Sequence, residues 1–258
     1  MRRLNYEEAV AVTHEIHWVG CNDAQAGLHC NPYLLLDQEE AVLIDPGSIP
    51  DFPVIMRKVI DVTDPGAISQ LIISHQDPDV CGNLAVVEDV IDRDDLRIVA
   101  HRNTVRLIRH LDPSSKFYSV DDEDFRLTLN SGRVLEFMHT PFLHSPGAIV
   151  TYDVKTRSLF SSDIFGAINA EGWNLFAGED FCERMAPFHQ AYMVNNQTLR
   201  KCLDALEQRW QIQRILPQHG SIIEGDDVAT AFAFLKGLPC GMDLYGTDLC
   251  GTDRDGAC

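Results

Sequence analysis

The sequence predicts an α/β fold in layers, with β-sheet inside and helices outside. Short apolar runs typical of strands alternate with amphipathic stretches typical of helices in both halves of the chain. Hydrophobic residues make up 45% and charged residues 23% of the 258 residues, as in ordinary globular proteins. A chain of this size buries roughly three quarters of its unfolded surface, so a large core is available.

The first predicted elements are a hairpin, a helix and a strand. Residues 33–44 contain two apolar runs on either side of the charged residues 37–40, which predicts two strands joined by a tight turn. Apolar residues follow at helical spacing over 53–62, and the run 71–74 is typical of a strand covered on both faces. A helix-then-strand rhythm therefore begins early.

The same rhythm continues to residue 235. Helices are predicted over 82–91, 101–111, 190–209 and 226–235, the last with Asp226 as its N-cap. Strands are predicted over 96–99, 134–138, 149–152, 158–160 and 212–216. We expect one domain over residues 1–235.

Residues 236–258 are expected to form a tail, because they contain five glycines, three cysteines and no periodicity. The eight cysteines of the chain include no C-x-x-C pair, so most are expected to be free thiols.

The charge balance excludes some classes of partner. Lys and Arg number 21 against 39 Asp and Glu, a net charge of −18, which repels nucleic acid and anionic membrane surfaces. No apolar run is long enough to span a bilayer, and no secretion signal opens the chain. We therefore expect a cytoplasmic protein with neither nucleic acid nor membrane as a partner.

Histidine and carboxylate side chains follow four of the strand-like runs. The carboxyl ends of strands in an open α/β sheet form a common rim where ligands bind. Any one of these residues is explained by ordinary capping of a strand or turn, but six together indicate a site. The six are His75, Asp77, Asp79, His144, Asp163 and His219.

The donor set indicates a redox metal. Structural zinc prefers a closed shell of thiolates and imidazoles, whereas mixed imidazoles and carboxylates with open positions suit iron or manganese. Three donors two residues apart, in His75-Gln76-Asp77-Pro78-Asp79, suit a loop around a pair of metals. We expect two iron ions, with manganese and zinc as alternatives.

These motifs resemble the metallo-β-lactamase superfamily, and within it the oxygen-binding di-iron proteins and the di-iron domain of flavodiiron proteins. Hydrolases of the superfamily carry H-x-H-x-D-H, whereas this chain has Asp77 where the second imidazole would be. The segment from Thr140 to His144 is one residue longer than the T-P-G-H of the hydrolases. Both departures are typical of the di-iron branch, and the matching motifs cover most of the first 235 residues.

The resemblance implies an αββα sandwich and a ligand set. It assigns His75, Asp77 and His144 to one iron, Asp79 and His219 to the other, Asp163 as the bridge, and Asp45 as a brace for the loop beneath the metals. Many flavodiiron proteins have a histidine where this chain has Val80, so the second iron is expected to have one protein ligand fewer.

The resemblance also implies function. We expect a protein that binds dioxygen as a sensor or store, or that reduces O2 or NO with electrons from a rubredoxin or flavoprotein. Flavodiiron proteins carry a flavodoxin-like domain, and no phosphate-cradling loop follows His219, so no FMN is expected in this chain. A homodimer is expected. The alternatives are a metal-dependent hydrolase of phosphodiesters, thioesters or lactones, and a regulatory module without metal.

Two further residues are candidates for hydrogen bonds to bound dioxygen. His29 lies in a loop and Tyr192 at the start of the helix predicted over 190–209. A donor at such a position stabilises developing charge on the ligand, although ordinary packing explains both residues equally well.

Overall fold

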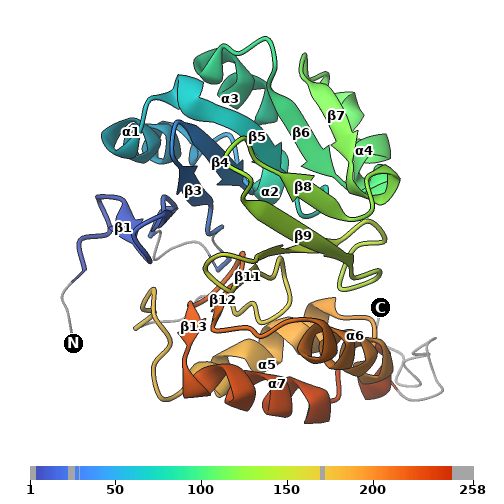
Figure 1. The fold of residues 1–258 in the computed structure, drawn as a ribbon. Coiled ribbons are helices and arrows are strands. Elements are labelled where there is room, and N and C mark those ends of the chain that lie inside the picture. The colour runs from blue at the N-terminus through green and yellow to red at the C-terminus, as the bar shows by residue number, and fades with distance from the viewer. Residues whose placement is uncertain (1–3, 23–26, 29, 169–171, 246–258) are drawn as a thin grey trace, which may run out of the picture.

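Two β-sheets face one another and helices cover the outer face of each (Figure 1). This computed structural model describes residues 4–22, 27–28, 30–168 and 172–245. The predicted αββα sandwich is confirmed.

The first sheet contains seven strands, which lie side by side in chain order. They are β1 (Val10–Ala11), β2 (Ile16–Trp18), β3 (Tyr33–Asp37), β4 (Glu40–Ile44), β5 (Ile68–Ile72), β6 (Arg97–Ala100) and β7 (Lys116–Ser119). β3 and β4 form the predicted hairpin, and β4 to β7 run parallel. The parallel strands therefore end at one common edge of the sheet.

The second sheet contains six strands in the order β13-β12-β11-β10-β9-β8. They are β8 (Arg126–Thr128), β9 (Val134–His139), β10 (Ile149–Asp153), β11 (Ser158–Phe160), β12 (Arg214–Leu216) and β13 (Ile223–Glu224). β11 and β12 are parallel neighbours although 53 residues lie between Phe160 and Arg214 in the sequence, so both strands end at the same edge.

Helices form the two outer layers (Figure 1). The first sheet is covered by α1 (Phe52–Val62), α2 (Pro78–Cys81), α3 (Leu84–Ile91) and α4 (Arg102–Ile108), and the second by α5 (Phe181–Tyr192), α6 (Asn196–Arg209) and α7 (Asp226–Gly237). Short 3-10 helices span Pro65–Ala67, Arg109–Leu111, Val120–Asp122 and Met242–Leu244.

Alternation along the strands produces three core layers. On β5, Ile72 packs between the two sheets, whereas Leu71 packs under the helices of the first sheet. Successive side chains of a strand point to opposite faces, so a strand buried on both faces is continuously apolar. No helix in the described part of the chain is both long and apolar enough to cross a membrane.

The helix predicted over 190–209 is wrong as a single element. The structure has two helices there, α5 ending at Tyr192 and α6 beginning at Asn196. The Asn195 side chain accepts a hydrogen bond of 2.8 Å from the Thr198 N–H and caps α6, which starts a new helix inside a continuous amphipathic pattern. The N-cap of α7 is Gly225, and Asp226 is its first residue.

The start of the predicted tail is packed onto the domain. α7 continues to Gly237, Cys240 is fully buried, and Gly241 forms a β-bridge with Asn195. The Asp243 carboxylate accepts a hydrogen bond of 2.7 Å from the Asn196 N–H. Residues 246–258 lie outside the described part of the chain, and the six cysteines within it are all free thiols.

Candidate metal centre

The ends of three strands place three of the six predicted ligands. His75 follows β5 of the first sheet, while Asp163 and His219 follow the parallel neighbours β11 and β12 of the second. Asp77 precedes α2, and Asp79 lies in its first turn. The loops of both sheets therefore meet at one edge of the sandwich, as the strand-end rule predicts.

Asp163 lies at the middle of this cluster. Its Oδ2 is 3.4 Å from His75 Nε2 and contacts His144 Nδ1, and its Oδ1 is 3.4 Å from His219 Nε2. The side chain is fully buried, and within the described residues neither of its oxygens has a hydrogen bond of acceptable geometry. A buried carboxylate that faces imidazole nitrogens without a well-formed hydrogen bond needs positive charge beside it, so this residue fits a position between metal ions.

The remaining donors form two groups, one on each side of Asp163. In the first lobe, defined as His75, Asp77 and His144, one ligand atom from each residue lies within 4.8 Å of the other two. Asp77 Oδ2 is 3.0 Å from His144 Nε2 and 3.7 Å from His75 Nε2. This spacing allows the three residues to surround one metal ion.

The second lobe is defined as Asp79 and His219. Asp79 Oδ2 lies 3.3 Å from His219 Nε2. Because Asp163 Oδ1 faces His219 while its Oδ2 faces the first lobe, each oxygen of the central carboxylate serves a different lobe. The structure thus brings all six predicted residues together as two unequal groups around a shared carboxylate.

The electrostatics of the cluster demand positive charge. Burial opposes ionisation of Asp163, but the surrounding imidazoles of His75, His144 and His219 hold the pKa of this carboxyl well below its usual range. Burial likewise opposes charge on His144, yet the close contact with the Asp163 carboxylate and the hydrogen bond to Asp77 raise the pKa of this imidazole to about 10. In the protein without metal, imidazolium charge takes the place that cations would occupy.

Two serines orient His75. Its Nδ1 lies 3.2 Å from Ser74 Oγ and 3.2 Å from Ser162 Oγ, which leaves Nε2 to face the site. The Asp45 carboxylate accepts a hydrogen bond of 2.8 Å from the Ser74 N–H. Burial raises the pKa of Asp45 to about 7. Ser162 was not among the residues predicted from the sequence; its position next to Asp163 was the one signal for it.

Gln76 joins the two loops of the first lobe. Its Nε2 donates a hydrogen bond of 2.9 Å to Asp77 Oδ1, and its Oε1 accepts a hydrogen bond from Ser145 Oγ. The loop after β5 is therefore tied to the loop that carries His144. Gln76 and Ser145 were not predicted as a pair, because no local pattern links residues so distant in the chain.

An aromatic wall on α5 borders both lobes. The Tyr192 ring lies 5.8 Å from the His144 ring and stacks on Phe188 at 4.8 Å, and Phe188 lies 5.4 Å from the His219 ring. Tyr192 is 46% exposed, so it stands at the open side of the centre, although it ends α5 rather than starting a helix. The other proposed donor, His29, lies outside the described residues.

A fourth histidine near the cluster, His189, has a structural role. His189 on α5 is fully buried; its Nδ1 is 2.8 Å from the Met185 carbonyl oxygen and its Nε2 accepts a hydrogen bond of 3.0 Å from the Phe165 N–H. Burial lowers the pKa of His189 to about 4. Both ring nitrogens are used by the backbone, so this imidazole offers no metal ligand.

Relatives with known names resemble parts of this chain. An anaerobic nitric oxide reductase flavorubredoxin from Salmonella arizonae is 29% identical over 174 residues, covering 61% of this chain and 35% of the relative. A putative diflavin flavoprotein A 1 from Nostoc sp. is 31% identical over 135 residues, covering 51% of this chain and 23% of the relative. The match thus spans about a quarter to a third of the length of these relatives.

Solved structures match over nearly the whole chain. A structure described as the peroxy diiron species of the chemotaxis sensor ODP has a TM-score of 0.78 and 26% identity, and the match covers 92% of this chain and 97% of that one. The flavodiiron protein from Giardia intestinalis has the same fold, with a TM-score of 0.78 at 21% identity, over 90% of this chain and 59% of its own.

The sequence pattern of one protein family matches residues 28–220, more than half of the chain. This segment contains the five residues of the two lobes and Asp163. The chain belongs to that family, which is described as the ODP family beta lactamase.

Proposed function

We propose that this chain is a non-haem di-iron protein that binds dioxygen. The observation that carries the proposal is the buried Asp163 carboxylate, which presents one oxygen to each of two lobes of imidazole and carboxylate donors. The first lobe would hold one iron and the second lobe the other, with Asp163 between them. A matching solved structure is described as a diiron species, which supports iron as the metal.

The protein's part in ligand binding follows from its side chains. A bound diferrous pair supplies two electrons and open Lewis-acidic positions for dioxygen. Asp77, Asp79 and Asp163 would balance the charge of the bound metals, and His75, His144 and His219 would act as neutral donors. We propose that Tyr192 donates a hydrogen bond to the bound ligand, supported by its place beside His144 at the open side of the centre. The same role for His29 stays a prediction.

We propose sensing or storage as the main role, with O2 or NO reduction as a second. Reduction of O2 to water takes four electrons and a diferrous pair holds two, so turnover needs an external donor such as a rubredoxin or flavoprotein. The description of one relative as a chemotaxis sensor supports the first role, and that of another as a nitric oxide reductase supports the second. The relatives favour both over hydrolysis.

We also propose that the protein acts as a homodimer in the cytoplasm. This part rests on the family resemblance and on the acidic composition, which suits neither a membrane surface nor nucleic acid. Light scattering after size-exclusion chromatography tests it, because a mass of one chain would exclude the dimer.

Metal analysis of protein prepared without oxygen tests the main proposal. We expect about two irons per chain, followed by a new visible absorption band when the diferrous protein meets air. Asp163→Ala serves as the control and is expected to show neither iron nor the band. Protein that takes up zinc but no iron would turn the assignment to hydrolysis, and a flat spectrum of the iron-loaded protein would exclude dioxygen binding.

A further inference from the structure

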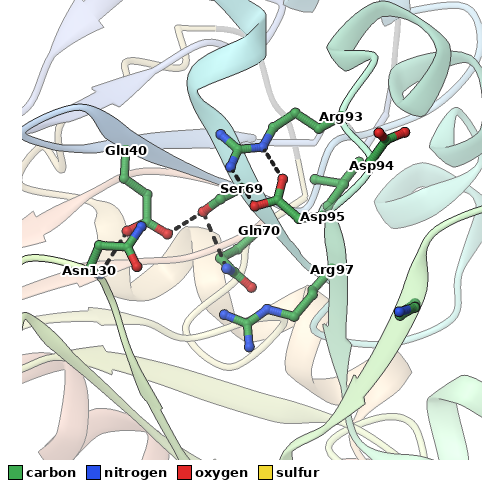
Figure 2. Close-up of a pocket in the computed structure, with 10 residues that line it drawn as sticks. Glu40, Ser69, Gln70, Arg93, Asp94, Asp95, Arg97 and Asn130 are labelled. Atoms are coloured by element: carbon green, nitrogen blue, oxygen red, sulfur yellow. Dashed lines mark hydrogen bonds and ion pairs between the residues drawn. The ribbon is translucent and has the colours of Figure 1, made fainter.

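A second polar site lies at the opposite ends of the strands. It is a cavity of about 330 Å³ at the amino ends of β4 to β7, whereas the metal ligands follow the carboxyl ends of strands. Figure 2 shows its lining. Its lining includes Glu40, Ser69, Gln70, Arg97, Lys116 and Asn130.

Three side chains of the cavity form one row across the sheet. Gln70 is the register partner of Arg97, and Arg97 is the register partner of Lys116. Partners in neighbouring strands project to the same face of a sheet. Ile72 and Val99, two residues further along, belong to the core between the sheets. The row therefore lies on the face of the first sheet that looks toward the second sheet, at the edge where the cavity opens.

Gln70 places a carbonyl oxygen without a hydrogen-bond partner in the wall of the cavity. Its side chain is 98% buried, and its Nε2 donates a hydrogen bond of 3.2 Å to Ser69 Oγ, but its Oε1 has no hydrogen-bond partner among the described residues. Figure 2 shows the amide of Gln70 between Ser69 and Arg97. A buried carbonyl oxygen without a donor is costly, so this atom points to a ligand with an N–H or O–H group.

Two cations of the cavity have no ion pair. Arg93 binds Asp95 through two hydrogen bonds of 2.7 and 2.9 Å. In contrast, within the described part of the chain no carboxylate lies within salt-bridge distance of Arg97 or Lys116, and the Arg97 guanidinium stands over the Tyr118 ring at 5.1 Å. Lys116 is exposed and Arg97 is half-buried, and the exposed Asp94 also lines the cavity. In a chain with a net charge of −18, a half-buried arginine without a carboxylate partner, next to a second cation, favours an anionic ligand.

The one buried carboxylate of the cavity is already satisfied. Glu40 accepts a hydrogen bond from Ser69 Oγ through Oε1 and another, of 2.9 Å, from the Asn130 N–H through Oε2. This carboxylate braces the wall formed by β4, β5 and the turn between β8 and β9. It does not compete for the row of Gln70, Arg97 and Lys116.

We propose that this cavity binds a small dicarboxylic acid that carries a hydroxyl or amino group. The two carboxylates face Arg97 and Lys116, and the hydroxyl or amino hydrogen is donated to Gln70 Oε1. The volume is near the lower end of the range for small-molecule sites, roughly 300 to 1,000 Å³, which suits a ligand of this size. The site is separate from the metal centre and does not depend on the function proposed above.

Calorimetric titration of the iron-loaded protein with L-malate, L-aspartate and succinate tests the proposal. Succinate matches the charge of malate but lacks the donor, so we expect it to bind about tenfold more weakly than malate or aspartate. The tighter of those two identifies the donor as hydroxyl or amine. Gln70→Leu is expected to remove the preference over succinate.

Charge variants locate the binding. Arg97→Gln is expected to weaken binding of the preferred acid by about tenfold or more, whereas Arg109→Gln, the same charge change on an exposed residue outside the cavity, leaves it unaltered. The iron content of each variant should match that of the parent protein. No heat with any of the three acids, or equal binding in Arg97→Gln and the parent, would overturn the proposal; the second result would place the acids at the irons.

Discussion

The two lobes of the metal centre share Asp163 but differ in how completely they are built. The first lobe places three donors within 4.8 Å of one another, and Gln76 ties its two loops together. The second lobe has only Asp79 and His219, whose ligand atoms lie 3.3 Å apart. Val80, which follows Asp79 in the chain, is fully buried in the core beneath the helices of the first sheet. A prearranged lobe binds metal more tightly than one with fewer ligands. The difference predicts two irons of unequal affinity.

Removing the shared carboxylate of Asp163 should empty both lobes of metal. Asp163→Ala leaves the donors of both lobes without the charge between them, so we expect loss of both metals. Elemental analysis per chain measures the loss, and circular dichroism should show a retained fold. Iron content equal to that of the parent protein would contradict the central role of Asp163.

Removing one imidazole from each lobe should separate the two irons. His75→Ala is expected to empty the first lobe, and His219→Ala the second, each leaving about one metal per chain. In competition with a chelator, the metal left in His219→Ala should be held more tightly than the metal left in His75→Ala. The reverse order would show that the second lobe is the stronger.

Adding a ligand to the second lobe should bring the metal affinities of the two lobes closer together. Val80→His offers the second lobe an imidazole, and we expect its metal to bind at least about tenfold more tightly. Because Val80 is fully buried among apolar residues, the metal-free variant should lose about 1–3 kcal/mol of unfolding free energy. Val80→Leu is the control. An unaltered affinity would mean that residue 80 cannot turn toward the lobe.

Loosening the first lobe should have a smaller effect. Gln76→Leu removes the hydrogen bonds to Asp77 and Ser145, so we expect the metal in the first lobe to bind about tenfold more weakly. Gln70→Leu, the same change at the far end of the sheet, is the control and should leave metal binding unaltered. Equal metal affinities in the two variants would show that the link between the loops does not position Asp77.

Asp45 is expected to affect the metal lobes least, because it contacts their loop only through Ser74; its effect is on the pH dependence of stability. Burial raises its pKa from 3.8 to about 7, so the folded metal-free protein binds the proton more strongly than the unfolded chain does. Its contribution to stability is therefore complete below pH 4 and is lost as the pH rises to about 7, with a slope of at most about 1.4 kcal/mol per pH unit. Asp45→Asn should lack this slope in chelator-treated protein. Identical pH profiles would contradict the shift.

Local patterns predicted most elements of the fold. The hairpin of β3 and β4 and the short strand β11 follow from apolar runs and turn residues. The break between α5 and α6 was missed, because the amphipathic pattern continues through residues 193–195 and only the cap by Asn195 shows where a new helix begins. Residues 236–245 were predicted as part of a tail. Their packing could not be predicted, because the contacts that bury Cys240 and hold Gly241 involve distant parts of the chain.

The identity of the donors, and their position after strands, could be predicted from local sequence patterns. His75, Asp163 and His219 each stand directly after or close to an apolar run, and the exchange of imidazole for carboxylate at Asp77 indicated the di-iron branch. Three features could be seen only in the folded chain: Asp163 presents one oxygen to each lobe, Gln76 reaches Ser145, and a polar cavity opens at the far end of the sheet. The reason is physical: strand ends are encoded by local periodicity, whereas the neighbours of each strand depend on packing between residues far apart in the chain.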